Sequence, residues 1–311
     1  MSDDAKHGLT FIVFIGSVFS PYYARARRRG RGDPLHHCAV NVALYGACGK
    51  RWAMTERGRR DVDGRDSELA IGRSALSWDG TALTLRFDEI TAPVPRRVRG
   101  VVRVYPQTLF GEVHALDSNA RHLWHPIAPV SRVEADLEHP RLRWSGSGYL
   151  DSNRGTEPLE EGFVSWNWAR AAPRGGINPT ASPPAALRAG YSSATPGGAS
   201  VLYDVKCRDG SARSLALRFP GDGTVNECQP PAALALPRTR WRMDRHIRVD
   251  GDAPVQVLET LEDSPFYARS LVAAELHGEP VIAFHESLSL VRWRTPWVQA
   301  MVPFRMPRRA R

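Results

Sequence analysis

Hydrophobic and polar residues alternate along much of the chain, most clearly over residues 141–168. Leu142 and Trp144 fall on one side of this alternation, whereas Tyr149 and Asp151 fall on the other. A repeat of two residues is the period of a β-strand, so this stretch predicts a strand that carries a carboxylate beside a phenol ring.

A second strand is predicted over residues 163–168, where the same period places Trp166 and Trp168 on one face. Residues 153–158, between the two strands, contain Asn, Gly and Pro, which are typical of turns. If both strands line one cavity, Asp151 faces indole and phenol rings.

Further segments with strand-like composition follow one another and are separated by clusters of Gly, Pro, Asp and Asn. They cover residues 11–19, 38–45, 51–55, 69–78, 83–87, 98–105, 201–207, 214–219, 241–249, 255–261, 266–275 and 281–290. Many short strands in a row, without long helical periodicity in the first half, predict an all-β sandwich or barrel rather than alternating strands and helices.

The composition shifts over residues 171–200 to Pro, Ala, Gly and Ser without an apolar period, which is typical of a linker or a long loop. We therefore expect a first domain over residues 1–171 that carries the candidate site, a linker over 172–200, and a smaller β domain with a basic tail over 201–311.

The net charge of +9 comes mostly from arginine, since lysine stands only at positions 6, 50 and 206. Because no recognised nucleic-acid motif accompanies this charge, we expect no nucleic-acid partner, whereas an anionic membrane surface suits it. The four cysteines lack Cys-x-x-Cys spacing, which indicates reduced thiols in a cytosolic protein. The apolar run over residues 9–19 is shorter than the roughly 20 residues that span a bilayer, so a buried strand is expected there.

The sequence lacks the common motifs of nucleotide and hydrolase chemistry. Gly146 and Gly148 begin a dinucleotide fingerprint, but Asp151 stands where a third Gly is required and would repel a pyrophosphate. Neither a Gly-x-Ser-x-Gly elbow nor a phosphate loop occurs, and the histidines lack zinc spacing. We expect no metal and no nucleotide cofactor.

Two pairs of residues, each two positions apart, could carry chemistry. His122 and Trp124 would share one strand face, and Tyr149 and Asp151 would share another. On adjacent strands they would assemble an acid, a base and two aromatic faces. Such pairs are also common in packed cores, so spacing alone leaves a purely structural role open.

The sequence resembles the bacterial carotenoid 1,2-hydratases, also called hydroxyneurosporene synthases, over nearly its whole length. The matching stretches are residues 14–23 (FIGSVFSPYY), 38–45, 51–59 (RWAMTERGR), 148–151 (GYLD), 157–160 (EPLE) and 264–270 (SPFYARS). The departures lie mainly in the Pro-rich segment and at residues 150–153, which affect loop shape and the preferred carotene.

The resemblance implies two lipocalin-like (calycin-like) antiparallel β-barrels in tandem. It also implies addition of water across the terminal C1–C2 double bond of an acyclic carotene such as neurosporene or lycopene, without a cofactor. The family's proposed catalytic set falls on His122, Trp124, Tyr149 and Asp151. The expected partners are the carotenoid, water and, by peripheral contact, the cytoplasmic side of the inner membrane.

Hydration of an isolated alkene needs a strong, dry acid, and Asp151 among aromatic rings is expected to stay protonated and to deliver its proton to C2. Trp124 and Tyr149 would then face the tertiary cation at C1, and His122 would accept a proton from the attacking water. Trp166 and Trp168 are candidates for the substrate-binding wall, with simple packing as the alternative.

Two other functions fit the same residues. A lipocalin-like carrier of an isoprenoid would need the cavity but not the carboxyl of Asp151. A different cofactor-free enzyme, such as a cyclase, would use the same barrels. The product formed from lycopene without added cofactor separates the three: a hydroxylated product, an unchanged ligand or an isomerised hydrocarbon.

Overall fold

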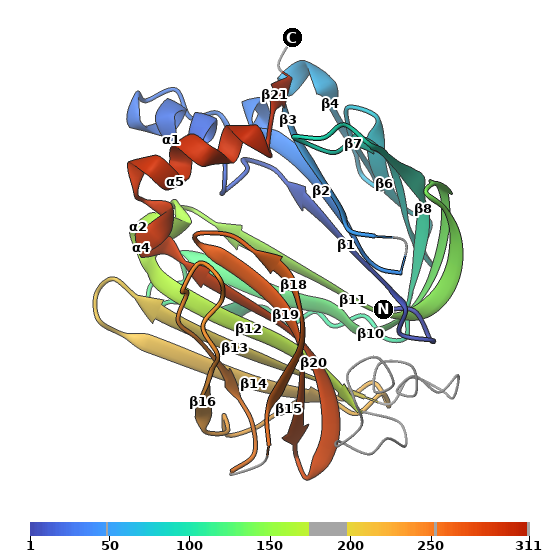
Figure 1. Ribbon diagram of the computed structural model, residues 1–311, viewed down its shortest axis with the longest axis vertical. Coiled ribbons are helices and arrows are strands. Elements are labelled where there is room, and N and C mark those ends of the chain that lie inside the picture. The colour runs from blue at the N-terminus through green and yellow to red at the C-terminus, as the bar shows by residue number, and fades with distance from the viewer. Residues whose placement is uncertain (48, 174–197, 252–253, 310–311) are drawn as a thin grey trace. The chain divides into compact units, whose positions relative to one another are not determined.

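The computed structural model describes residues 1–47, 49–173, 198–251 and 254–309, and strands, nearly all paired antiparallel, are the main elements of their fold (Figure 1). The contacts divide the chain into two compact units. The first comprises Met1–Pro106, Arg132–Gly148 and Gln299–Arg311, and the second comprises Gln107–Ser131 and Tyr149–Val298. The all-β prediction is confirmed, although these units do not follow the predicted domain boundaries.

The elements of the first unit are β1 (His7–Phe14), α1 (Pro21–Arg28), η1 (Pro34–His36), β2 (Cys38–Gly46), β3 (Arg51–Arg57), η2 (Arg59–Asp61), β4 (Val62–Arg65), β5 (Glu68–Ile71), β6 (Ser74–Trp78), β7 (Leu83–Ile90), β8 (Arg97–Pro106), η3 (Val302–Phe304) and β21 (Arg308–Arg309). One sheet has the order β1-β2-β3-β21, and β4 to β8 pair in sequence in another. The core between them is built from β-branched and leucine side chains such as Val42, Val102 and Leu137.

The elements of the second unit are β9 (His114–Ala115), α2 (Leu159–Gly162), β12 (Phe163–Pro173), β13 (Ala199–Cys207), β14 (Ala212–Phe219), β15 (Asn226–Glu227), β16 (Ala233–Leu236), β17 (Arg245–Arg248), β18 (Gln256–Asp263), β19 (Tyr267–Leu276), β20 (Glu279–Ser289) and α4 (Leu290–Trp293). Both units receive residues from β10 (His122–His139), β11 (Arg141–Gly155) and α5 (Pro296–Met301).

A seven-stranded sheet in the order β15-β14-β13-β12-β20-β19-β18 organises the second unit. Its apolar core includes Ala169, Leu202 and Val272 from this sheet, which pack with Leu236 of β16 and Ile247 of β17. Because successive side chains of a strand point to opposite faces, Trp166 and Trp168 of β12 lie on the face opposite Ala169. The sheet thus has one apolar core face and one aromatic face.

The predicted interdomain linker connects neighbouring strands of this one sheet. β12 and β13 pair antiparallel from Phe163 opposite Cys207 to Ala171 opposite Ser200, and both belong to the second unit. Residues 174–197 lie outside the described residues. The composition of this segment indicated only that its apolar periodicity is lost. It does not show whether the strands on either side pair in the same sheet.

One local prediction in the first unit is corrected. The strand expected over residues 11–19 ends at Phe14, because Gly16 adopts a φ of 70° and turns the chain. Ser20 then caps α1 by accepting a hydrogen bond from the Tyr23 amide, with proline in the first turn. A Ser-Pro pair is a known helix start, so the signal was present in the sequence.

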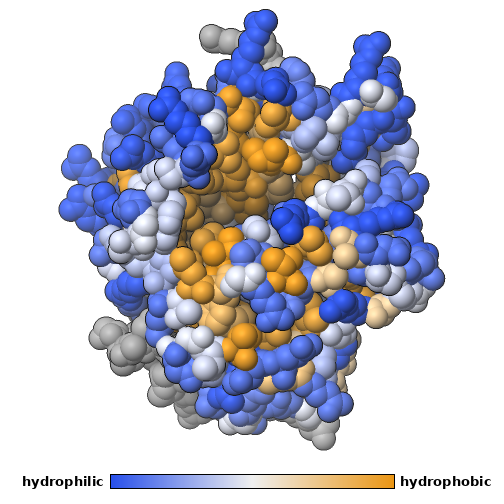
Figure 2. Space-filling view, turned by 180° about the vertical axis from the view of Figure 1, so that it is seen from behind, coloured by the Kyte–Doolittle hydropathy of each residue, from blue (hydrophilic) through white to orange (hydrophobic). Residues whose placement is uncertain are grey.

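Closure of these sheets into two barrels remains a prediction, since the strand orders give linear paths among the described residues. Cys38, Cys207 and Cys228 are free thiols as expected, whereas Cys48 lies outside the described residues. In the described part of the chain, no helix is both long and apolar enough to cross a membrane. Figure 2 shows hydrophobic residues that reach the surface of one face among hydrophilic ones.

Candidate active site

The four candidate catalytic residues belong to the second unit and lie on two strands. His122 and Trp124 begin β10, where both side chains are buried while Leu123 between them is less so. Tyr149 and Asp151 lie near the end of β11, where both are partly exposed. The two-residue spacing therefore places each pair on one strand face, as the alternation predicted.

One carboxylate oxygen of Asp151 is the point at which three of the four candidates meet. The indole Nε1 of Trp124 donates a hydrogen bond of 2.9 Å to Oδ2 of Asp151, and the hydroxyl of Tyr149 donates another of 2.9 Å to the same atom. Both donors are neutral groups. The carboxylate is thus oriented by two hydrogen bonds without a cation as a direct partner of this oxygen.

Burial raises the pKa of Asp151 to about 6, although the hydrogen bonds from Trp124 and Tyr149 favour the charged form and oppose this rise. Desolvation and the charge of Asp151 hold the pKa values of Tyr149 and Tyr203 well above 10, so both phenols stay protonated at neutral pH. Roughly one Asp151 carboxyl in ten is then protonated at pH 7. The carboxyl of the ligand-free protein is therefore mostly ionised at pH 7, whereas we expected it to stay protonated, but it can take up and release a proton near neutral pH.

Aromatic rings surround this carboxyl on several sides. The ring of Tyr149 lies 5.1 Å from that of Trp168, and the ring of Trp124 lies 5.4 Å from that of Tyr203 in an edge-on arrangement. Trp166 in turn lies 6.2 Å from Tyr203. Such faces present negative quadrupole potential, so they can stabilise a cation without forming a bond to it.

Tyr203 is a residue of the site that was not predicted from the sequence. Its strand was predicted, but its position depends on pairing with β12, in which Trp168 is directly opposite Tyr203. Because the sequence suggested a domain boundary between these strands, it gave no reason to place this phenol in the site.

Trp166 and Trp168 both contribute to the aromatic face, as expected for a substrate wall. Their indole Nε1 atoms are buried and have no hydrogen-bond partner among the described residues. A buried N–H group without a partner is unfavourable, so these donors are suited to a water molecule or a polar group of a ligand. Their role in substrate binding stays a prediction.

His122 makes its contacts outside this cluster. Its Nδ1 is 3.2 Å from Oδ2 of Asp117 and 3.9 Å from Oε1 of Glu157, and its ring packs 4.4 Å from that of Phe163. Nε2 is buried without a hydrogen-bond partner among the described residues. No hydrogen bond or ring contact joins His122 to Asp151 in the described part of the chain.

Asp117, which was also not predicted from the sequence, is the orienting group of His122. Burial opposes its charge, but the backbone amides of Arg121, His122 and Asn119 and the ring of His122 outweigh this and lower the pKa of Asp117. An ionised Asp117 that accepts from Nδ1–H leaves Nε2 of a neutral imidazole as a proton acceptor. A short turn of Asp, Ser and Asn before a strand was the only sequence signal for it.

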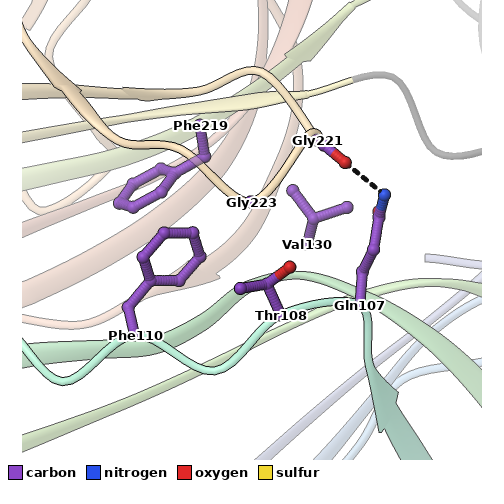
Figure 3. A pocket seen from close by; sticks show the side chains of 7 residues that line it. All are labelled: Gln107, Thr108, Phe110, Val130, Phe219, Gly221 and Gly223. Atoms are coloured by element: carbon purple, nitrogen blue, oxygen red, sulfur yellow. Dashed lines mark hydrogen bonds between the residues drawn. The ribbon is translucent and has the colours of Figure 1, made fainter.

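A small pocket of the second unit lies elsewhere, between Phe110 and Phe219 (Figure 3). The remaining lining residues are Gln107, Thr108, Val130, Gly221 and Gly223, and Gln107 donates a hydrogen bond to the carbonyl of Gly221. None of these side chains is ionisable, so the pocket offers no group for acid–base chemistry.

Comparison with known proteins identifies relatives over nearly the whole chain. A family model described as carotenoid hydratase CrtC matches residues 11–182 and 188–311. An acyclic carotenoid 1,2-hydratase from Thiocapsa roseopersicina is 54% identical over 99% of this chain and 71% of that protein. Proteins of the same name are 48% identical in Rubrivivax gelatinosus, over 100% of this chain and 72% of the relative, and 38% identical in Cereibacter sphaeroides, over 96% and 98%.

A solved structure from Nitrosomonas europaea, described by the name AttH, is similar in fold. It aligns with a TM-score of 0.50 and 12% identity over 81% of this chain and 80% of that chain. Identity this low supports the β-rich architecture alone.

Proposed function

Because the chain belongs to the carotenoid hydratase family, we propose that it is a hydro-lyase that adds water across the terminal C1–C2 double bond of an acyclic carotene. The observation that carries this proposal is the Asp151 carboxyl, which titrates at about 6 and accepts hydrogen bonds from Trp124 and Tyr149. Addition of water transfers no net electrons, so the reaction needs no redox cofactor.

Asp151 delivers its proton to C2, and the electron pair of the double bond forms the new C–H bond. The tertiary cation that results at C1 lies against the faces of Trp124, Trp168 and Tyr203, each worth roughly 2 kcal/mol when desolvated. Because an apolar chain displaces water from the site, bound substrate further favours the neutral carboxyl. Aromatic faces stabilise the cation but do not capture it, which leaves C1 open to water.

The attacking water forms the C1–O bond and releases one proton. We assign this proton to Nε2 of His122, which Asp117 orients through Nδ1. Return of the proton to the Asp151 carboxylate then restores both groups. C1 carries two methyl groups, so the face from which water attacks leaves no stereochemical mark.

The test is the product formed from lycopene in detergent micelles without added cofactor. Asp151→Asn keeps the size and hydrogen-bonding capacity of the residue but cannot supply the proton, so hydration should fall by at least about 10²-fold while carotene binding is retained. His122→Gln should reduce hydration by a smaller factor. In D₂O the wild-type product should carry one deuterium at C2.

Each alternative has its own outcome in this assay. Unchanged lycopene with wild-type protein would indicate a carrier, and an isomerised hydrocarbon would indicate a cyclase. A folded Asp151→Asn protein with undiminished hydration would exclude Asp151 as the acid. Undiminished hydration by His122→Gln would assign deprotonation of the water to the Asp151 carboxylate itself.

We further propose peripheral contact with the cytoplasmic side of the inner membrane, where an acyclic carotene is dissolved. Support comes from Trp241 and Trp297, which are 41% and 52% exposed with their rings 6.2 Å apart. Exposed Arg240 and Arg242 flank Trp241 in sequence, and exposed Arg294 lies three positions before Trp297. Exposed indoles beside arginines suit the interface of an anionic membrane.

Flotation with vesicles tests this surface. Trp241→Ser combined with Trp297→Ser should strongly reduce binding to vesicles that contain anionic lipid, because two interfacial indoles are lost. Substitution of exposed Leu109, which has no aromatic neighbour in the described contacts, is the matched control. Equal binding by wild type and the double variant would refute this surface.

A further inference from the structure

A row of five side chains crosses the seven-stranded sheet beside the candidate site. Trp168 of β12 is opposite Tyr203 of β13 on one side and Glu286 of β20 on the other. Glu286 is opposite Arg269 of β19, and Arg269 is opposite Glu262 of β18. Directly opposed residues of neighbouring strands project from the same face, so this row continues the aromatic face toward a group of charges.

Arg269 is the centre of that group and is only 2% exposed. Its Nε and Nη2 lie 2.8 and 2.7 Å from Oε1 of Glu286, and its Nη1 lies 2.8 Å from Oε1 of Glu262. The guanidinium also lies over the rings of Tyr267 and Phe284. A planar, permanently charged fork in this setting holds both carboxylates in fixed positions.

These contacts leave Glu286 charged but make its bound oxygen unsuitable for acid–base or nucleophilic chemistry. An oxygen already engaged by two guanidinium N–H groups is a poor base and a poor nucleophile. Its negative potential nevertheless extends to the neighbouring Trp168, because charge in a partly buried setting is weakly screened. Trp168 contacts Tyr149, which donates to Asp151.

We propose that Glu286 is a positioning residue of the site: fixed by Arg269, its carboxylate supplies constant negative potential to the aromatic face that carries Trp168 and Tyr203. Two consequences follow. The potential opposes ionisation of Asp151 and so keeps its proton in place. It also stabilises positive charge that develops among the rings, a consequence that rests on the proposed hydration.

The titratable groups that interact electrostatically with Asp151 come from four strands. Tyr149 of β11 and Tyr203 of β13 stay neutral, because burial and the charge of Asp151 raise their pKa values well above 10. His125 of β10 lowers the pKa of Asp151, whereas Glu286 of β20 raises it. Among these groups, Glu286 is therefore the anion whose removal should favour the ionised form of Asp151.

The experiment titrates Asp151 in the ligand-free protein, so that it does not depend on the proposed reaction. The infrared band of the protonated carboxyl is followed against pH and assigned by its loss in Asp151→Asn. Glu286→Gln should lower the titration midpoint by about 0.5 to 1 unit, the effect of one nearby charge that is partly shielded. Circular dichroism and thermal unfolding establish that each variant is folded.

Glu262→Gln is the matched control, because it removes the same charge from the same arginine on the far side of the row. Its midpoint should shift by less than half as much. A folded Glu286→Gln protein with the wild-type midpoint would overturn the proposal, and so would an equal or larger shift in Glu262→Gln, which would indicate a general effect of disturbing Arg269.

A replacement is available if Glu286→Gln does not fold. Glu286→Gln combined with Arg269→Met and Glu262→Gln removes the whole charge cluster and leaves neither an unpaired guanidinium nor an unpaired carboxylate, a change that buried ion pairs often tolerate. Its midpoint should still fall, because the variant loses one net negative charge and Glu286 is the nearest of the three charges to the aromatic face. An unchanged or raised midpoint would overturn the proposal. In the hydration assay, the alkaline limb of the pH–rate profile should move in the same direction as the infrared midpoint.

Discussion

Asp151 and Asp204 are two partly buried carboxyls of the second unit whose pKa values shift in opposite directions. Asp151 accepts from an indole and a phenol, and burial raises its pKa to about 6. For Asp204, burial likewise opposes the charge, but hydrogen bonds from His246, Ser214 and Arg248 outweigh it and lower the pKa. Nε of Arg248 lies 2.7 Å from Oδ1 of Asp204.

The comparison indicates that the pKa of a half-buried carboxyl depends more on the charge of its hydrogen-bond donors than on their number. Neutral donors orient Asp151 but only partly offset its desolvation, so a proton remains available for chemistry. A guanidinium converts Asp204 into a permanent anion that ties β13 to β17, which is a structural task. A carboxyl that must donate a proton therefore belongs among rings, away from arginine.

Glu89 of the first unit shows that this rule does not extend to fully buried carboxyls. It is 1% exposed and lies 2.7 Å from Arg57, yet desolvation still exceeds the effect of Arg57 and Ser74 and raises its pKa. Full burial can outweigh even a cationic partner. The contrast between Asp151 and Asp204 thus holds for carboxyls of intermediate exposure, where donor charge decides the balance.

The largest expected effect concerns Asp204. Asp204→Asn leaves the guanidinium of Arg248 without its anionic partner, and we expect the free energy of unfolding at pH 7 to fall by about 2 to 4 kcal/mol, near the lower end for broken buried pairs because both groups are partly exposed. Urea unfolding followed by tryptophan fluorescence measures it. Asp244→Asn is the control, since its pair with Arg238 lies at the surface and should barely matter. A change no larger than the control's would mean that Asp204 is not a structural anchor.

The sequence predicted the parts of the site that lie within single strands. Two-residue spacing placed His122 and Trp124 on one face of β10, and Tyr149 and Asp151 on one face of β11. The sequence did not indicate which strands become neighbours in the sheets. Tyr203, Glu286 and Arg269 reach the aromatic face only through pairing across β13, β12, β20 and β19, and their partners are distant in the chain.

Other misses have local causes. The partner of His122 is Asp117, held by a turn whose backbone amides carry no side-chain pattern that a sequence displays. The Pro-rich segment had the composition of a linker, yet β12 and β13 on either side of it share one sheet. Composition is a property of one segment, whereas strand pairing is stabilised by contacts between segments that are far apart in the sequence.

The smaller expected effect concerns Asp151 and has the opposite sign from that at Asp204. The pKa of Asp151 rises from 3.8 to about 6 on folding, so the folded state binds this proton more tightly and the contribution of this one carboxyl to stability is greatest below pH 4. That contribution is lost as pH rises through 6, because the folded state must then ionise a carboxyl whose charged form it disfavours. Asp151→Asn removes this penalty, and we expect it to stabilise the protein by about 2 kcal/mol above pH 7 and by little at pH 4.

Urea unfolding at both pH values measures the difference. Stabilisation that is equal at pH 4 and pH 8 would mean that the gain arises from packing, and destabilisation at pH 8 would mean that the ionised carboxylate is favoured, as at Asp204.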